Sequence, residues 1–154
     1  MKIAVASDHA GFELKAAVVR TLAERRIPFE DFGCGPGETA NYVDFAEKAC
    51  RAVLDKTCDR AILVCGTGMG MAMAANKFPG IRATPCWTPY TADMARRHND
   101  SNCLTLGGRV LTEHEGLEIV RVWLETPFEG GRHRLRLDQL AALEARACRA
   151  RSSP

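Results

Sequence analysis

The sequence predicts an α/β protein, a three-layer α/β/α sandwich around a five-stranded parallel sheet of the Rossmann-like type. Two observations lead to this fold class. Short apolar runs alternate with longer stretches of helical period, which is the pattern of consecutive β-α-β units. The length of 154 residues suits one ordinary domain, and neither a repeat nor a linker divides it. We therefore assign residues 1–146 to a single domain and residues 147–154 to a basic C-terminal tail.

The chain begins with a predicted strand, a helix and a second strand. Ile3–Ala6 is a short apolar run of the kind that forms a buried strand. Phe12–Arg25 has helical period, and Pro28–Phe32 is a further strand that leads into a glycine-rich segment. The apolar side of the helix carries five side chains: Phe12, Leu14, Val18, Val19 and Leu22.

The middle of the chain predicts a helix, a strand and a short helix. Asn41 or Asp44 can cap a helix that ends near Leu54, because both side chains accept hydrogen bonds from free N–H groups. Ala61–Val64 is a buried strand, and Gly70–Asn76 is a short helix rich in Met and Ala.

The second half of the chain continues the alternation. Ile81–Thr84 is a predicted strand that stops before a proline, and Pro89–Arg97 is a helix with proline at its start. Cys103–Leu106 is the fifth strand, and helices over Thr112–Glu125 and Arg132–Arg146 follow it. Strands joined by helices run parallel, so helices are expected on both faces of the sheet.

Composition argues against several classes of protein. The net charge of +2 is too small to indicate a nucleic-acid partner or a membrane surface. No stretch reaches the roughly eighteen apolar residues of a membrane helix, and the N-terminus lacks the features of a signal peptide. Seven cysteines without a C-x-x-C pair indicate free thiols in a reduced, cytoplasmic location. The basic end ARACRARSSP fits a solvated helix end better than a nucleic-acid-binding tail.

A glycine-rich turn directly follows the third predicted strand. The segment CGTGMG places Cys65 ahead of Gly66, Gly68 and Gly70. Ligands of open parallel sheets bind at such carboxyl strand ends. The N–H groups of a turn that opens a helix form a nest for an anion. A cysteine in this position is favoured as the thiolate, and the N–H groups suit a developing oxyanion.

Three known motifs with similar turns do not fit this segment. A P-loop needs a lysine directly after its last glycine, whereas the first lysine here is Lys77. A dinucleotide fingerprint needs G-x-G-x-x-G and a later acidic residue, whereas the spacing here is G-x-G-x-G and Arg82 is the next charged residue after Lys77. A cysteine phosphatase needs an arginine six positions after the nucleophile, where this chain has Met71. An anion nest beside a thiol remains, and the other six cysteines are interpreted as buried structural residues.

Further candidate residues lie near predicted strand ends. Asp8 and His9 follow the first strand and can be either a helix cap or a catalytic pair. His98 and Asn99 lie between a helix and the last strand, and Arg109 follows that strand.

The C-terminal part adds a pair of arginines. Arg132 and Arg136 stand four positions apart, so they share one helix face. They can grip one phosphate together or form a solvated basic face, and spacing alone does not decide between these. His114 and His133 are assigned to the surface, and no spacing of His, Cys, Asp or Glu indicates a metal site.

Five segments together resemble one family. They are SDHAGFELK at 7–15, CGTGMGMAMAANKFPGIRA at 65–83, RRHNDSN at 96–102, LGGRV at 106–110 and EGGRHRLR at 129–136. In this order they resemble the ribose-5-phosphate isomerase B family, which also includes galactose-6-phosphate and allose-6-phosphate isomerases. The resemblance implies an aldose–ketose isomerase that acts through a cis-enediol, without metal or cofactor. It implies ribose 5-phosphate and ribulose 5-phosphate as the sugar phosphates.

The resemblance also implies roles for the candidate residues. Cys65 is implied as the base that moves a proton between C1 and C2, and His98 as the group that opens the sugar ring. Thr67 is implied to hold the enediolate oxygens. Backbone amides of the turn are implied to assist it: Gly66, Gly68, Met69 and Gly70. The sugar and its phosphate are implied to contact Asp8, His9, Tyr42, Asn99, Arg109, Arg132 and Arg136.

The glycine loop contains one candidate base. Some relatives place a glutamate base in this loop, but GMGMAMAAN contains no carboxylate, which leaves Cys65 as the only base of the loop.

Two alternatives for the function stay open at this point. The same chemistry can serve another substrate: allose 6-phosphate, galactose 6-phosphate or a tetrose phosphate. A catalytically silent sugar-phosphate binding protein is the second alternative, and it would not need the set of Cys65, Thr67 and His98.

Sheet geometry predicts a homodimer, or a tetramer built from it, with active sites shared between subunits. Cys65 follows a strand and lies at the carboxyl edge of the sheet, whereas His98 precedes a strand and lies at the amino edge. Five residues at roughly 3.3 Å each separate these edges by about 17 Å. Arg132 and Arg136 are returned to the amino edge by the helix before them. We therefore expect His98 to serve the Cys65 of a partner, whereas Arg109 serves its own chain.

Overall fold

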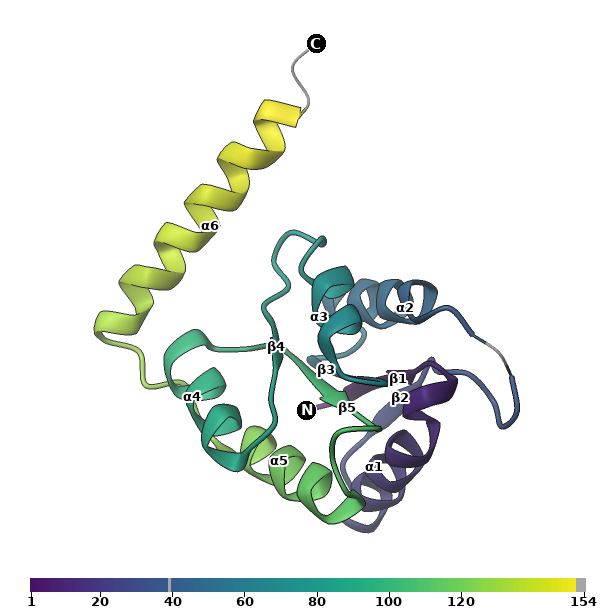
Figure 1. Cartoon of the computed structure of the whole chain (residues 1–154). Helices are drawn as coiled ribbons and strands as arrows, with labels where there is room; N and C mark the ends of the chain where they lie inside the picture. The colour runs from purple at the N-terminus through teal and green to yellow at the C-terminus, as the bar shows by residue number, and fades with distance from the viewer. Residues whose placement is uncertain (39, 152–154) are drawn as a thin grey trace.

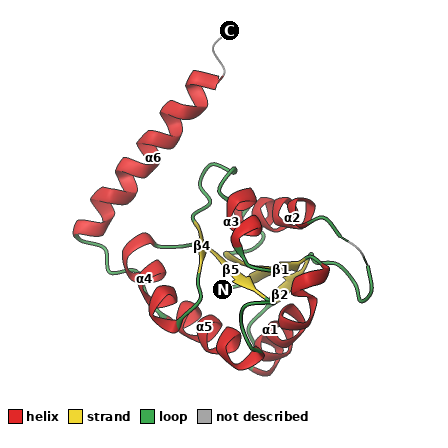
Figure 2. Ribbon diagram, in the orientation of Figure 1, coloured by secondary structure: helices red, strands yellow, loops and turns green. Residues whose placement is uncertain are grey.

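The computed structural model describes residues 1–38 and 40–151 and shows a parallel sheet with helices on both faces (Figure 1, Figure 2). The strands are β1 (Ile3–Ser7), β2 (Phe29–Asp31), β3 (Arg60–Cys65), β4 (Ala83–Pro85) and β5 (Cys103–Gly107). They form one five-stranded sheet in the order β2-β1-β3-β5-β4, with every neighbouring pair parallel. The predicted α/β/α fold class is therefore confirmed.

Helices precede and follow the strands as the alternating pattern predicts. They are the 3-10 turn η1 (His9–Gly11), α1 (Phe12–Glu24), α2 (Tyr42–Leu54), α3 (Met69–Ala75), α4 (Pro89–Asn99), α5 (Glu113–Glu125) and α6 (Arg132–Arg151). Asn41, not Asp44, caps α2, because its Oδ1 accepts the Val43 N–H at 3.2 Å.

The two faces of the sheet differ in side-chain size. Alternate residues of a strand point to opposite faces, so β1 presents Ile3 and Val5 on one side and Ala4 and Ala6 on the other. The larger side chains pack under α1, α4 and α5. The alanine face packs under α2 and α3, together with the buried side chain of Cys65. Cys65 thus belongs to the small-residue side of the core.

The strand β4 begins two residues later than the sequence predicts. Just before β4, a side chain takes the place of a neighbouring strand as hydrogen-bond partner, because the Asn102 Oδ1 accepts the Arg82 backbone N–H at 2.7 Å. Asn76 pairs with the Ala83 backbone through both its amide nitrogen and its amide oxygen, each at 2.9 Å. Ile81 is buried but stays outside the strand. The apolar run therefore predicted a strand in the right region but not the residue at which strand pairing begins.

Both outermost strands are short. β2 and β4 have three residues each, and they form the two margins of the sheet. β2 carries the charged side chains of Glu30 and Asp31, and β4 ends at Pro85.

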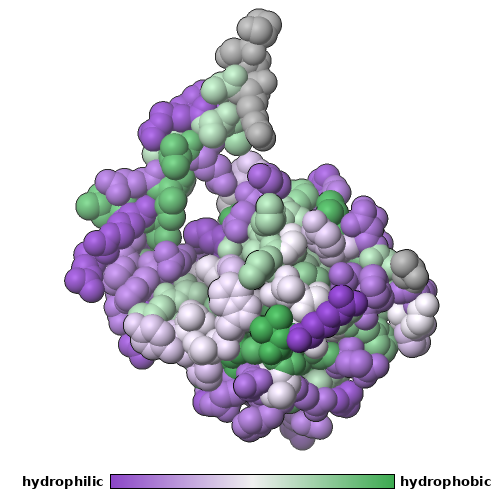
Figure 3. Space-filling view, in the orientation of Figure 1, coloured by the Kyte–Doolittle hydropathy of each residue, from purple (hydrophilic) through white to green (hydrophobic). Residues whose placement is uncertain are grey.

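The C-terminal helix α6 projects from the body of the domain (Figure 1). It continues through Arg151 rather than ending at Arg146, so the predicted tail begins inside this helix. Residues 152–154 of that tail lie outside the described residues. Apolar side chains are exposed along the helix (Figure 3): Leu135, Leu140 and Leu143. Cys148 on α6 is also exposed, whereas the other cysteines interpreted as structural are buried.

Among the described residues, no helix is both long enough and apolar enough to cross a membrane.

Candidate active site

Three loops at the carboxyl edge of the sheet are joined through their backbones. The loop after β1 contributes Asp8, whose backbone N–H donates to the Val64 carbonyl near the end of β3 at 3.2 Å. In the loop after β5, the Gly108 N–H donates to the Cys65 carbonyl at 2.8 Å. The Arg109 N–H donates to the Gly66 carbonyl at 3.0 Å. Backbone bonds of this kind hold the side chains of the three loops in defined positions.

The sulfur of Cys65 lies where β3 meets the glycine-rich turn. Its residue is only 5% exposed, and its Sγ accepts a hydrogen bond from the Gly68 N–H at 3.2 Å. Gly68 can take this position because its φ of 82° is left-handed, a conformation that favours glycine. Beside it, the Thr67 Oγ1 accepts the Met69 N–H at 3.3 Å. An N–H that points at the sulfur stabilises negative charge there, as a thiolate base requires.

Most candidate residues surround one cavity of about 240 Å³ next to this sulfur. Its lining consists of Asp8, His9, Ala10, Tyr42, Cys65, Gly66, Thr67, Gly70 and Arg109. All of these except Ala10 are candidates named from the sequence. The same turn contains the remaining two candidates, the buried Gly68 and Met69, which begins α3 and is 53% exposed.

The carboxylate of Asp8 caps a helix, which is one of the two alternatives considered for it, and it also lies at the cavity. Its Oδ1 accepts the Gly11 N–H at 3.0 Å and so caps η1. The same side chain is 7% exposed and lines the cavity next to Cys65. A cap that fixes the carboxylate also fixes where its charge faces a ligand.

Four other candidate residues lie away from both the cavity and the glycine-rich turn. His98 and Asn99 end α4, and Asn99 lines a separate hollow of about 500 Å³ between α6 and β4. Arg132 and Arg136 are exposed in the first turns of α6. The structure therefore places the candidate residues in two groups, one at the carboxyl edge of the sheet and one where α4 meets α6.

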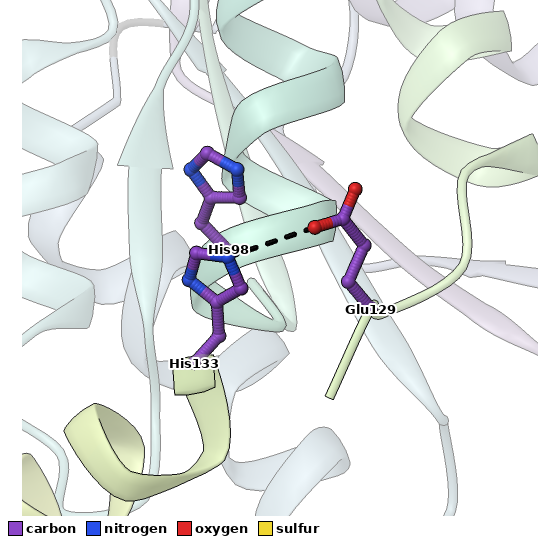
Figure 4. Close-up of side chains that lie close together, drawn as sticks. All are labelled: His98, Glu129 and His133. Carbon is purple, nitrogen blue, oxygen red and sulfur yellow. Dashed lines mark ion pairs between the residues drawn. The ribbon is translucent and has the colours of Figure 1, made fainter. Parts of the chain in front are cut away.

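The second group is built around two histidines (Figure 4). The rings of His98 and His133 stack with their centroids 4.1 Å apart and their planes 9° from parallel. His133 is only 5% exposed, so the prediction that it lies on the surface was wrong. His114, by contrast, is exposed. A helical pattern could have revealed His133, because it stands four positions before the buried Leu137 on the same face of α6.

The surroundings of His133 favour the neutral ring. Burial lowers its pKa below the ordinary value of 6.5, and the nearby His98 and Arg132 lower it further, whereas Glu129 raises it. The Arg132 Nε donates to the His133 Nε2 at 3.4 Å, which requires a free lone pair on that nitrogen. The Glu129 carboxylate lies 3.6 Å from the same Nε2 and can form an ion pair only with a protonated ring. We take the bond from Arg132 as the one present near neutral pH.

His98, Glu129 and His133 also offer three ligand atoms within 4.8 Å of one another, a grouping that chain spacing did not reveal. Ring nitrogens bind a metal along lone pairs that lie in the ring plane. Because the two rings are nearly parallel, their lone pairs do not converge on one point. The Arg97 guanidinium, 3.2 Å from Glu129, already neutralises the carboxylate. The arrangement is therefore that of an imidazole pair and not of a preformed metal site.

The turn that carries His98 and Asn99 is held by two arginines. Arg82 Nε donates to the Asn99 and Asp100 carbonyls, both at 3.1 Å. Arg96 is 3% exposed, and its Nη1 bonds the Asp100 carboxylate at 3.0 Å. Asp100 itself has a φ of 42°, which is uncommon for a residue other than glycine. These bonds offset the strain and fix the end of α4.

Comparison with known proteins finds relatives over nearly the whole chain. A family model described as Ribose/Galactose Isomerase matches residues 3–140. Ribose-5-phosphate isomerase B of Escherichia coli K12 is 43% identical over 145 residues, which is 94% of this chain and 97% of that protein. A D-erythrulose-4-phosphate isomerase of Pectobacterium atrosepticum is 38% identical over 132 residues, which is 85% of this chain and 87% of that protein.

Solved structures show the same likeness in three dimensions. The structure of ribose-5-phosphate isomerase B from Clostridium thermocellum superposes with a TM-score of 0.94 at 44% identity. It covers 96% of this chain, and this chain covers 99% of it. With the sequence match, the shared fold and the thiol-containing glycine turn in place, the chain belongs to the ribose/galactose isomerase family.

Proposed function

We propose that this protein interconverts D-ribose 5-phosphate and D-ribulose 5-phosphate through a cis-enediol. The observation that carries the proposal is the sulfur of Cys65, which accepts the Gly68 N–H inside a cavity that Asp8 and Arg109 also line. The sequence likeness to the Escherichia coli isomerase supports this choice of substrate.

The proton transfer begins on the open-chain aldose. The Cys65 thiolate removes the proton from C2, and the C2–H electrons form a C1–C2 double bond while the carbonyl electrons move to the C1 oxygen. The proton then returns from sulfur to C1, and the proton of the C2 hydroxyl passes to the C1 oxygen, which leaves a carbonyl at C2 and a hydroxyl at C1, the ketose. One substrate supplies all the electrons, so the reaction has no net redox change.

The enediolate oxygens need donors because a proton next to a carbonyl is only weakly acidic. The Thr67 hydroxyl and the N–H groups of the glycine turn lie beside Cys65 and are suited to this task. Loss of one such donor costs about 3–4 kcal/mol in other enzymes. The turn is therefore proposed to contribute as much as the base.

The phosphate is proposed to bind away from the reacting carbons. His9 and Arg109 line the same cavity as Cys65. Arg132 and Arg136 are proposed to reach the phosphate from a partner subunit. Binding energy from this remote group would hold C1 and C2 against the sulfur.

A twofold dimer is proposed because the site needs both groups of residues. His98, which we propose to open the sugar ring with Asp8, is outside the cavity of its own chain. Large apolar side chains are exposed shortly after the ends of β3, β4 and β5: Met69, Trp87, Tyr90 and Val110. Exposed apolar side chains that follow strand ends at one edge of a sheet are consistent with a surface that another subunit covers. The exposed leucines of α6 offer a second such surface.

Replacement of the proposed base tests the function directly. Cys65→Ser should keep the fold and substrate binding but lower kcat by more than about tenfold, since a serine hydroxyl is scarcely ionised near neutral pH. Cys86→Ser is a matched control, because its buried thiol bonds Thr84 and a hydroxyl can do the same. Steady-state assays of ribose 5-phosphate isomerisation measure both variants. A Cys65→Ser enzyme with most of its kcat would rule out this base.

A second candidate substrate is a tetrose phosphate. The likeness to the D-erythrulose-4-phosphate isomerase of Pectobacterium atrosepticum favours it. Comparing kcat/KM for four-, five- and six-carbon aldose phosphates separates these substrates. A catalytically silent binding protein would bind one of them without turnover.

A further inference from the structure

We propose that His133 is a positioning residue whose buried ring holds the ring of His98 in the orientation needed to open the sugar. The inference rests on the proposed role of His98 in ring opening. It concerns the imidazole pair, His98 and His133, where α4 meets the start of α6 (Figure 4).

The stacked geometry restrains the His98 ring. Its centroid lies 4.1 Å from that of His133, and the rings are 9° from parallel, which is the distance of close face-to-face contact. His98 is half-buried on the last turn of α4, where an imidazole without a neighbour could rotate about its side-chain bonds. One face of the ring is covered by His133, so rotation of the ring plane would cost this contact.

The backbone that carries the His133 ring is held firmly. The His133 backbone N–H donates to the Gly130 carbonyl at 3.0 Å at the start of α6. The preceding segment is tied to α4, because the Glu129 N–H donates to the Arg97 carbonyl at 3.1 Å. The same two residues are joined through their side chains at 3.2 Å. His133 is thus fixed relative to the helix that carries His98.

The charged groups around the pair fit a neutral support. Arg132 donates to the His133 Nε2. The positive charges of Arg132 and Arg136 disfavour protonation of the His133 ring, whereas the negative charge of Glu129 favours it. On α4, hydrogen bonds from Arg97 lower the pKa of Asp93, and positive charge on His98 lowers it further, so Asp93 is the acidic group of α4 that interacts with His98. Burial lowers the pKa of His133, so near neutral pH it offers an uncharged face. His98, whose ring is the more exposed of the two, then exchanges protons with the sugar.

An experiment in D2O separates ring opening from enediol formation. Ribulose 5-phosphate cannot form a furanose, because its C5 oxygen carries the phosphate. Exchange of its C1 hydrogen for deuterium therefore needs Cys65 but no ring step, whereas net formation of ribose 5-phosphate ends in the ring. Both rates are measured on the same substrate by NMR, and KM for ribulose 5-phosphate is measured separately.

His133→Ala should lower net isomerisation by about tenfold or more while C1 exchange changes by less than about threefold, since only an acid–base step is lost. KM should stay within about twofold of wild type, because the bond to His133 uses the Arg132 Nε and leaves both terminal nitrogens of that guanidinium for the phosphate. His133→Phe keeps a flat ring at this position and should restore isomerisation to within about threefold of wild type. His114→Ala, at the exposed histidine of α5, is the control for loss of an imidazole.

Three results would overturn the proposal. An equal fall of both rates in His133→Ala would indicate a general structural role. A raised KM with unchanged kcat would make His133 a phosphate ligand. Failure of His133→Phe to restore isomerisation, in a protein that unfolds at the wild-type temperature, would exclude stacking as the cause. His98→Ala tests the underlying role separately. If His98→Ala lowers isomerisation and C1 exchange equally, His98 does not act in ring opening and its proposed role fails. If His98→Ala lowers isomerisation more than C1 exchange but His133→Ala does not, only the proposal for His133 fails.

Discussion

Single residues in this protein act through the backbone as much as through their side chains. The sulfur of Cys65 gains its hydrogen bond only because Gly68 takes a left-handed conformation. Gly70, two positions later, leaves room for Tyr42: a Cβ built on Gly70 would lie 3.0 Å from two atoms of the Tyr42 ring. The glycines of the turn therefore set the positions of two candidate residues.

Gly70→Ala should displace the Tyr42 ring from the cavity. Alanine is favoured over glycine inside a helix, so the free energy of unfolding should not fall by more than about 1 kcal/mol. The value of kcat/KM should fall about tenfold, or roughly 1.4 kcal/mol, because the sugar loses a contact. The same substitution made in a Tyr42→Ala protein is the control. An equal loss in both backgrounds would show that Gly70 acts without Tyr42.

The sequence identified the residues of the cavity better than those of the imidazole pair. Cys65, Asp8 and Arg109 follow strands, and strand ends of a parallel sheet meet at one edge, so their proximity follows from topology. His133 follows no strand, and its burial depends on how the first turn of α6 docks against α4. The apolar Leu137 four positions later is a weak local signal for this face, but it does not show which helix covers the face, so a surface position was predicted.

At the scale of elements, the end of α4 is fixed more strongly than a helix of this length would be alone. The adjacent residues Arg96 and Arg97 show how burial decides the energy of a charged contact. Arg96 is buried and donates to the Ser101 and Thr126 carbonyls as well as to Asp100. Arg97 is exposed and pairs with acidic side chains at the surface.

Arg96→Ala should lower the free energy of unfolding by about 2–4 kcal/mol, because it leaves buried carbonyls and a carboxylate without their donor. Arg97→Ala should lower it by less than about 1 kcal/mol, because exposed ion pairs contribute little. Urea unfolding of both variants measures the difference. Similar losses in the two proteins would contradict the assignment of stability to the buried arginine.

Element boundaries show where local pattern is overridden. Short apolar runs located all five strands, and the pattern is clearest for β1, β3 and β5, which are buried on both faces, whereas β2 at one margin has two exposed residues. The late start of β4 follows from the side chains of Asn76 and Asn102, which bond its backbone from distant parts of the chain. The extension of α6 to Arg151 follows from its composition of good helix formers, because no glycine or proline interrupts it.

At the scale of the whole molecule, the two groups of candidate residues predict complementation between damaged chains. Cys65→Ala and His98→Ala should each be inactive alone. After subunit exchange, half of random dimers are mixed and hold one intact site, so roughly a quarter of wild-type activity should return. Activity on ribose 5-phosphate measures the recovery, and native mass spectrometry confirms the mixed dimers.

A matched pair of variants controls for this result. Cys65 and Arg109 line the same cavity of one chain, so Cys65→Ala mixed with Arg109→Ala leaves no site intact and should recover nothing. Recovery in the control, or none in the first mixture despite mixed dimers, would contradict sites shared between subunits.

The short margins of the sheet limit how chains of this protein can aggregate. An exposed strand edge is a template on which a second chain can add a strand, and long flat edges lead to amyloid-like stacking. Here one margin offers three residues with two carboxylates, and the other offers three residues that end in proline. A proline lacks the N–H that a new strand would need, and the charged side chains of β2, which form ion pairs with Lys2 and Lys15, disfavour the addition of a strand from another chain. Growth of the sheet from one molecule into the next is thereby blocked on both sides, which leaves helix and loop surfaces as the route for specific assembly.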